Sequence, residues 1–559
     1  MKESKNISRS RAQESSAAIE KMYITMRHLF NRGFYKPMGI SGDTLREALL
    51  ALRPEIYGNI AEEKVELNGL LYVIERLPVG IEQCRFINLT SDEGYSKSHF
   101  QAIVPPKRRR NCYRIDEEQM NVEITRGRSD IYDILTHLTF IFIESHKIRN
   151  RVLLDDAGEV SRDWLKLEQA VNQTKKLPLV EKEKAISHVA NILGRTFEDV
   201  LNIYDAFGSE TAPDRFLHII YWLGKLAIEE VIENNKRTIT FSPILRERLG
   251  HHIHGEIWAT NIKEVLKANG LLDRPIHVIS ANMHSVMNSI FATPLLKTKF
   301  KDKSDFFIYE ELSKSGATIR KDVEAIALKN GMISLLDTSG TNIDVQIFDT
   351  AKIDWAKTAF PKADLGDKKP VIIVMDYAFG EQAYETIDEL LKPYKKDTLL
   401  NVKSVSIMGK AGILEGGKGD IMIPTAHINE GTADNYFFKN ELTAEMFEGN
   451  DIAVFEGAMV TVLGTSLQNR DLLKFFHEST WSVIGLEMEG SYYQKAIQSA
   501  SKIRKSVPHD IKVRYAYYAS DNPLETGSTL ASGGLGTTGV KPTYLITIKI
   551  LEQIFNVKQ

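Results

Sequence analysis

The feature that most constrains this chain is a change of pattern near Asp273-Arg274-Pro275. Before it, apolar residues recur mostly at helical spacing, and after it short β-rich runs alternate with helical stretches. Such alternation is typical of βαβ units built around a largely buried sheet. We therefore expect an α/β domain over residues 271–559 and a mixed, mostly helical domain of regulatory or oligomerising role over residues 1–270.

The pattern predicts individual elements as well. We expect C-terminal strands at 276–280, 371–375, 402–408, 420–424, 453–463, 482–487 and 511–519. Helices are expected between them at 284–290, 319–330, 380–391, 470–476, 490–505 and 543–554, with a hairpin through 338–342. The N-terminal half predicts helices at 20–31, 42–53, 129–149, 181–193 and 214–233, and strands at 70–74 and 84–89.

Composition narrows the class of protein. The 559 residues are 43% hydrophobic, which suffices for two or three cores. Lys and Arg number 71 against 74 Asp and Glu, so no global field favours nucleic acid or an anionic membrane. With two cysteines, no membrane-length apolar run and a polar N-terminus, we expect a soluble cytoplasmic protein. His251, His252 and His254 lack a nearby acidic or thiolate partner, and no metal is expected.

Two basic segments leave alternatives open. Residues 105–111 read Pro-Pro-Lys-Arg-Arg-Arg-Asn, and residues 125–130 place Arg126 and Arg128 at a predicted helix start with Ser129 as its cap. Together they predict either a phosphate site or a solvated loop followed by a capped helix.

Two carboxylates in the C-terminal half suggest a chemistry. Glu489 ends the run Gly485-Leu486-Glu487-Met488-Glu489, and Asp521 follows a predicted strand. Cleavage of an N-glycosidic bond leaves a cationic ribose and an anionic base, so it needs an ionised carboxylate at the sugar hydroxyls and a protonated acid at the base. We assign these roles to Glu489 and Asp521 respectively. The alternatives are a carboxylate at a helix N-terminus and a turn residue before Pro523.

Other polar or small groups follow predicted strands in chain order. They occupy residues 280–285, 376–380 and 409–412, and ligands of open α/β sheets collect at such carboxyl ends. Further along come Lys418-Gly419-Asp420-Ile421-Met422-Ile423-Pro424, then Glu487-Met488-Glu489 and Ser520-Asp521. In this order, with Phe379-Gly380 and a glycine turn at Gly409-Lys410-Ala411-Gly412, residues 275–559 resemble the nucleoside phosphorylase superfamily. With the extra N-terminal domain and Ser520-Asp521-Asn522-Pro523-Leu524, they look most like its AMP nucleosidases.

The resemblance implies a three-layer α/β catalytic domain acting on a purine nucleoside or nucleotide. It implies that Met488 lies against ribose, that Glu489 binds sugar hydroxyls and that Asp521 protonates the base. Thr465, Leu467 and Gln468 would flank the base. Residues 409–412 would line the anion side, and Glu487, Ser520 and Ser285 would complete the substrate site. A homo-oligomer is implied, with no cofactor except inorganic phosphate as a possible co-substrate.

One departure from the family leaves the reaction open. Hydrolysing members carry a glutamate after the first strand, where this chain reads Asn282-Met283-His284-Ser285. His284 either acts as the base, holds phosphate together with Ser285, or is structural. Hydrolysis, phosphorolysis and a nucleotide-binding sensor therefore all remain. Met488 is either a substrate contact or core filler. The small-residue stretch 528–540 predicts either a flap over the pocket or a linker.

Overall fold

The computed structural model describes the chain except residues 1, 174–176, 210–211, 315–317, 396–397, 433, 526–534 and 558–559, and it describes side chains from residue 10 onward. Its internal contacts divide the chain into two compact units. The first unit comprises residues 1–125, 130–251 and 466–472, and the second comprises 126–129, 252–465 and 473–559. Residues 126–129 and 466–472 thus belong to a different unit from the residues on either side of them in the sequence.

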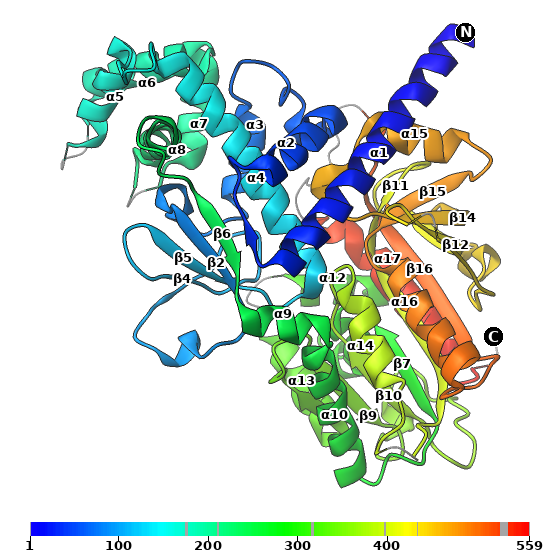
Figure 1. Ribbon diagram of the computed structural model, residues 1–559. Coiled ribbons are helices and arrows are strands. Elements are labelled where there is room, and N and C mark those ends of the chain that lie inside the picture. The colour runs from blue at the N-terminus through cyan, green and yellow to red at the C-terminus, as the bar shows by residue number, and fades with distance from the viewer. Residues whose placement is uncertain are drawn as a thin grey trace. The chain divides into compact units, whose positions relative to one another are not determined.

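The first unit combines many helices with one sheet, as the spacing of apolar residues in this half predicts (Figure 1). The strands lie in the order β1 (Phe34–Tyr35), β6 (Thr238–Phe241), β2 (Phe86–Thr90), β5 (Gln119–Glu123), β4 (Cys112–Arg114) and β3 (Ala102–Ile103). The helices are α1 (Lys2–Arg32), α2 (Ile40–Leu52), α3 (Leu67–Ile74), α4 (Gly127–Val152), α5 (Arg162–Val171), α6 (Leu179–Leu193), α7 (Phe197–Phe207), α8 (Arg215–Ile232) and α9 (Pro243–Gly250).

Two local predictions for the N-terminal half were wrong. Residues 70–74 belong to helix α3 and not to a strand, because the Glu66 carboxylate accepts hydrogen bonds from the amides of Asn68 and Gly69 and so caps a helix there. Helix α4 begins at Gly127, so Ser129 lies inside its first turn and is not its cap.

The second unit is a three-layer α/β structure, which confirms the predicted fold class. Its main sheet runs β13 (Asn435–Phe437), β12 (Ile421–Asn429), β14 (Val454–Thr461), β15 (Val483–Glu487), β11 (Val402–Ile413), β7 (Ile276–Ser280), β10 (Val371–Met375), β9 (Val345–Asp349) and β8 (Met332–Leu335). Strand β16 (Lys512–Asp521) pairs with β11 and β12. The predicted 338–342 hairpin is confirmed, since β8 and β9 are antiparallel.

Successive residues of one strand point to opposite faces of the sheet, and β10 shows how each face is covered. Val371, Ile373 and Met375 pack in a core with α10 (Ile253–Ala268), α14 (Gln382–Leu390) and α16 (Gly490–Gln498). Ile372 and Val374 pack in the opposite core with α11 (Met283–Leu296), α12 (Asp305–Ser313), α13 (Ile319–Lys329) and α17 (Val540–Ile554). Helix α15 (Arg470–Glu478) precedes β15 in the chain. Both faces are therefore buried, as the apolar strand sequences require.

Most predicted C-terminal elements are confirmed within a few residues, with two corrections. The predicted 490–505 helix is α-helical only to Gln498 and continues as a π-helical turn over Ser499–Arg504. Gly409–Gly412 is no glycine turn, because β11 continues through these residues and pairs with β16, with a register shift between Ala411 and Gly412. Part of the predicted flap, residues 528–534, lies outside the described residues. Leu535 precedes a short 3-10 helix at Gly536–Gly539.

Candidate functional site

A cavity of about 310 Å³ opens in the second unit where several strands end; we call it the Glu489 cavity. Its floor is formed by β11 and its walls by the ends of β7, β15 and β16 and by the loop after β10. The lining residues are Arg126, Ser280, Tyr377, Ala378, Phe379, Ile407, Met408, Gly409, Lys410, Ala411, Gly412, Val462, Thr465, Leu486, Glu487, Met488, Glu489, Tyr493, Tyr517, Tyr518 and Ser520. The chain thus collects polar groups at the carboxyl ends of strands, where α/β sheets bind ligands.

Glu489 lies half-buried between β15 and α16. Its carboxylate does not cap that helix, but instead accepts a 2.9 Å hydrogen bond from the backbone amide of Gly380. Burial raises the pKa of Glu489 to about 7, and the positive charge of Arg126 opposes this rise. The group therefore titrates close to neutral pH and faces a cavity of ligand size.

Glu487 has a different environment. Its side chain is buried, accepts a hydrogen bond from the Thr461 hydroxyl and takes further ones from the amides of Glu489 and Gly490 at the start of α16. Burial and the nearby charge of Glu489 raise the pKa of Glu487 to about 8. Both oxygens are used inside the protein, so Glu487 lines the cavity while capping the helix that follows it.

Asp521 lies at the end of β16, in register with Gly412 of β11. Its side chain is 2% exposed and lies behind the lining residue Ser520, whose hydroxyl hydrogen-bonds to Asp521 Oδ1. The other oxygen, Oδ2, is buried and has no hydrogen-bond partner among the described residues. Burial raises the pKa of Asp521, against the charges of Lys410 and Lys418. Such surroundings favour the protonated acid.

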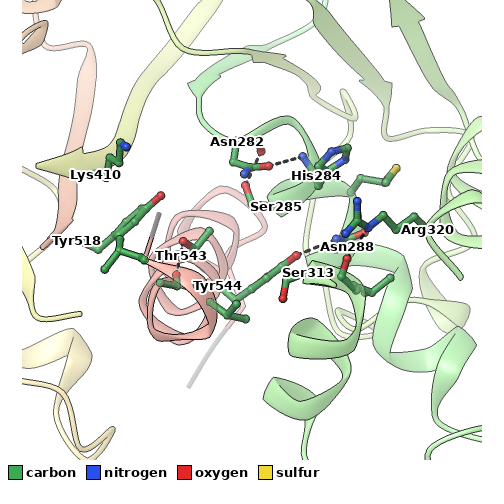
Figure 2. A pocket seen from close by; sticks show the side chains of 16 residues that line it. Asn282, His284, Ser285, Asn288, Ser313, Arg320, Lys410, Tyr518, Thr543 and Tyr544 are labelled. Atoms are coloured by element: carbon green, nitrogen blue, oxygen red, sulfur yellow. Dashed lines mark hydrogen bonds between the residues drawn. The ribbon is translucent and has the colours of Figure 1, made fainter. Parts of the chain in front are cut away.

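A second cavity, of about 330 Å³, adjoins the first; we call it the His284 cavity (Figure 2). Lys410 and Tyr518 line both cavities, which makes the two neighbours. Figure 2 shows His284 and Arg320 on one side and Lys410 with Tyr518 on the other. Partial burial, followed by the charge of Arg320, lowers the pKa of His284, which favours the neutral imidazole. The lining residues that the structure describes include no aspartate or glutamate.

The predicted residues of the loop after β7 have unequal roles. Asn282 caps α11 by accepting a 2.9 Å hydrogen bond from the amide of His284. The Ser285 hydroxyl donates to the Asn282 carbonyl oxygen at 2.8 Å, and its side chain is buried. Ser285 is therefore engaged with its own backbone, whereas the His284 ring is exposed at the cavity.

The three residues predicted to flank the base, Thr465, Leu467 and Gln468, do not all line one cavity. Thr465 lines the Glu489 cavity, whereas Leu467 and Gln468 are buried within residues 466–472 of the first unit. There the Gln468 carbonyl oxygen accepts a 2.9 Å hydrogen bond from the amide of Glu55. Met488 lines the cavity and also packs against a small apolar cluster that includes Val460 and Leu486.

The two basic segments are also distinguished. Arg108 and Arg110 form ion pairs with Asp133 and Asp130 inside the first unit, so these two arginines are neutralised internally, whereas Lys107 and Arg109 of the same loop are exposed. Arg126 instead belongs to the second unit, where it lines the Glu489 cavity with its guanidinium 5.1 Å from the centre of the Phe379 ring.

Sequence reasoning missed the aromatic lining of the Glu489 cavity. Tyr377, Phe379, Tyr493, Tyr517 and Tyr518 all border it. Tyr493 is fixed by a 2.9 Å hydrogen bond between its hydroxyl and that of Ser280. Clustered tyrosines at 515–518 were a visible signal, but buried aromatic residues more often form core, and only the fold shows which of them meet a cavity.

Comparison with known protein families matches residues 43–306 and 305–556 to a family of unknown function, DUF6909. The chain belongs to the DUF6909 family. No curated protein matches this DUF6909 member. None of its described helices is long and apolar enough to span a bilayer, and its described residues include no group of three or more His, Cys, Asp or Glu placed to hold a metal ion.

Three solved structures illustrate its structural likenesses, each at 12% identity. A 5′-methylthioadenosine/S-adenosyl homocysteine nucleosidase of Campylobacter jejuni aligns over 51% of this chain and 100% of its own, with a TM-score of 0.31. A futalosine hydrolase mutant of Helicobacter pylori aligns over 50% of this chain and 99% of its own, with a TM-score of 0.29. A uridine phosphorylase of Schistosoma mansoni aligns over 51% of this chain and 88% of its own, with a TM-score of 0.31.

Proposed function

We propose that the second unit cleaves the N-glycosidic bond of a purine nucleoside or nucleotide, by AMP-nucleosidase-like hydrolysis. The observation that carries this proposal is that Glu489 and Ser520 line one cavity at the ends of β15 and β16, with the Asp521 carboxyl group hydrogen-bonded to Ser520 behind that lining. The carboxyl group of Glu489 has a pKa of about 7, whereas Oδ2 of Asp521 is buried away from solvent. Glycosidic cleavage needs two acidic groups in such different states.

Glu489 stabilises the sugar in this mechanism. As the bond to the base lengthens, ribose gains positive charge and its hydroxyl groups become stronger hydrogen-bond donors. The ionised Glu489 carboxylate accepts from those hydroxyls, and the amide of Gly380 holds it in place. Met488 provides an apolar contact for the sugar ring beside it.

Asp521 protonates the leaving base. The base gains electron density as it departs and leaves more readily when a ring nitrogen receives a proton. The protonated carboxyl group of Asp521 has its buried Oδ2 free of hydrogen bonds to described residues, so this oxygen is available to a base that enters beside Ser520. After cleavage, Asp521 is left ionised and recovers its proton from solvent when the base leaves.

The nucleophile enters from the His284 cavity. In hydrolysis, neutral His284 accepts the proton of a water molecule that attacks the anomeric carbon. Phosphorolysis is a second candidate, because Arg320, Lys410 and His284 surround a cavity whose described lining holds no carboxylate. That arrangement suits an oxyanion, either a phosphate co-substrate or the 5′-phosphate of a nucleotide. Arg126 is a further candidate for contact with a 5′-phosphate, from the Glu489 cavity.

The proposal extends to cofactors, oligomeric state and cellular location. The reaction requires no metal and no organic cofactor, since positioned charges and a nucleophile suffice. We further propose a cytoplasmic homo-oligomer in which the N-terminal domain has a regulatory or oligomerising role. Light scattering of the purified protein tests the oligomer, and a monomeric mass would remove that part alone.

Chromatography tests the chemistry. Purified protein is incubated with AMP, adenosine, methylthioadenosine or inosine, each with and without inorganic phosphate, alongside the Asp521→Asn variant. Free base released without phosphate supports hydrolysis, and release that requires phosphate supports phosphorolysis. If no substrate releases base, or if the variant matches the wild type, the proposed reaction is wrong.

A further inference from the structure

A third cavity, of about 360 Å³, lies at the opposite end of the sheet from the proposed active site. It is lined where neighbouring strands begin: Pro275 precedes β7, Pro370 precedes β10, Lys403 is near the start of β11, and Lys512 begins β16. These four strands are parallel. Ser520 lies six positions after Arg514 in β16, which at about 3.3 Å per residue places the two ends roughly 20 Å apart.

The sheet face at this cavity changes from apolar to polar. Towards the strand ends, Ile279, Met408 and Ala516 pack in the core beneath α17. Nearer the strand starts, the same face carries a polar row in register: His277 pairs with Ser404, and Ser406 pairs with Arg514. Polar side chains on a covered sheet face are costly unless they have partners or a ligand.

Arg514 is the central residue of this row. Its side chain is 2% exposed, yet no described carboxylate pairs with it. Its Nε donates a 2.5 Å hydrogen bond to Gln553, its Nη1 reaches the Ser406 hydroxyl at 3.5 Å, and its Nη2 has no partner among the described residues. Burial lowers the pKa of Arg514 to about 10, only partly offset by the charge of Glu441. A buried guanidinium without a counter-charge is uncommon, because its desolvation remains uncompensated.

Further positive charge surrounds Arg514. Lys368, Lys403 and Lys512 line the cavity and are exposed. Burial and then the charges of Arg514, Lys512 and Lys403 lower the pKa of His277 to about 4. Negative contributions are weaker: Asp510 is an exposed carboxylate in the lining, and α17 ends here with the negative end of its dipole. Four basic side chains outweigh them.

We propose that this cavity, which we call the Arg514 site, binds a small phosphate-bearing anion. Arg514 supplies the buried donor, Lys403 and Lys512 supply charge at the rim, and His277 adds a polar lining group. Ser404 and Ser406 lie behind this lining, hydrogen-bonded to His277 and Arg514. Free phosphate, a phosphate monoester and a diphosphate share this chemistry. The proposal does not depend on the glycosidic reaction, because the residues involved are separate from those of the Glu489 and His284 cavities.

Titration calorimetry and thermal unfolding of the full chain test the site. The probes are inorganic phosphate, glycerol phosphate and pyrophosphate, at constant ionic strength set with sodium chloride. At least one of them is expected to bind the wild type and raise its melting temperature, and the strongest ligand shows which phosphate class the site takes. The double variant Lys403→Gln/Lys512→Gln is expected to bind that ligand about tenfold or more weakly, since charge-assisted hydrogen bonds and ion attraction are lost.

Three further variants locate the binding. Arg514→Gln is expected to abolish the ligand-induced rise in melting temperature. Lys410→Gln, which alters the other two cavities, and Lys301→Gln/Lys474→Gln, which removes two exposed lysines elsewhere, are expected to retain it. If Arg514→Gln does not fold, the rim double variant decides. Absence of binding to the wild type, undiminished binding in the rim variant, or loss of binding in Lys410→Gln would overturn the proposal.

Discussion

The backbone amide of Gly380 donates a 2.9 Å hydrogen bond to a carboxylate oxygen of Glu489, although the two residues are 109 positions apart in the sequence. The next amide, that of Glu381, donates to the Ser129 hydroxyl at 2.9 Å. The loop after β10 is therefore anchored on both sides, and the orientation of the Glu489 carboxylate depends on a residue with no side chain of its own.

Replacing Gly380 tests this anchor. Gly380 has φ +56°, and a Cβ atom there would collide with the Ser129 side chain. We expect Gly380→Ala to lower the free energy of unfolding by about 1–3 kcal/mol and turnover by about tenfold, because the loop must shift away from Glu489. The matched double variant Gly380→Ala/Ser129→Gly removes the collision and is expected to restore part of both. Denaturant unfolding and steady-state kinetics measure this, and wild-type behaviour of the single variant would refute the anchor.

Removing the proton donor is the sharpest test of the proposed chemistry. Asp521→Asn keeps the size of the side chain but cannot protonate a base. We expect turnover to fall about a hundredfold or more while substrate binding stays measurable. Asp367→Asn, at an exposed position of the same unit, is the matched control and should behave as wild type. Base release is followed by chromatography and binding by calorimetry; unchanged turnover would exclude Asp521 as the acid.

The pH dependence should report Glu489. Its pKa is raised to about 7, so the carboxylate form that accepts from ribose hydroxyls is lost as pH falls through 7. We expect kcat/KM to fall about tenfold per pH unit below this point. Glu489→Gln should reduce kcat/KM about a hundredfold at pH 8 and remove that acidic limb, because the amide does not titrate. A limb that persists in the variant would assign it to another group.

Arg320 should distinguish substrates by their charge. Its guanidinium borders the His284 cavity, and we expect Arg320→Gln to raise the KM for phosphate or for a nucleotide about tenfold or more, with little effect on an uncharged nucleoside in the absence of phosphate. Arg320→Lys keeps the charge, so its KM for these substrates should lie between that of Arg320→Gln and that of the wild type. Lys321→Gln, at the exposed neighbouring residue, is the control. Equal effects on charged and uncharged substrates would contradict an oxyanion contact.

Glu430 should make stability depend on pH independently of activity. Burial raises the pKa of Glu430 to about 7, so between pH 4.5 and 7 the folded state holds a proton that the unfolded state has released. This contribution is fully present below pH 4.5 and is lost as pH rises through 7. The free energy of unfolding should therefore fall between pH 4.5 and 7, and we expect Glu430→Gln to make this fall smaller by about 1–3 kcal/mol. Chemical denaturation at several pH values measures it, and parallel curves would show that Glu430 does not titrate in this range.

The pattern of the sequence was sufficient for most elements of the second unit. Strands β7 and β10 coincide with their predicted ranges because each is a short apolar run, bounded by a proline on one side and by polar residues on the other. The strand predicted at residues 70–74 failed, because an apolar run of that length fits either state and the capping side chain of Glu66 decided for helix. The continuation of β11 through Gly409–Gly412 was hidden because glycine normally marks a turn, whereas pairing with β16 extends the strand.

By itself, the sequence determined the α/β class of the C-terminal half and singled out Glu489 and Asp521, because hydrophobic spacing and strand-end chemistry are local properties. Only the tertiary structure decided that Arg126 lines the same cavity as Glu489, that Leu467 and Gln468 belong to the other unit, and that Arg514 is buried with no carboxylate partner among the residues that the structure describes. Those facts depend on contacts between distant segments. A residue's burial and charge partners are set by what the fold brings beside it, and no local pattern specifies that.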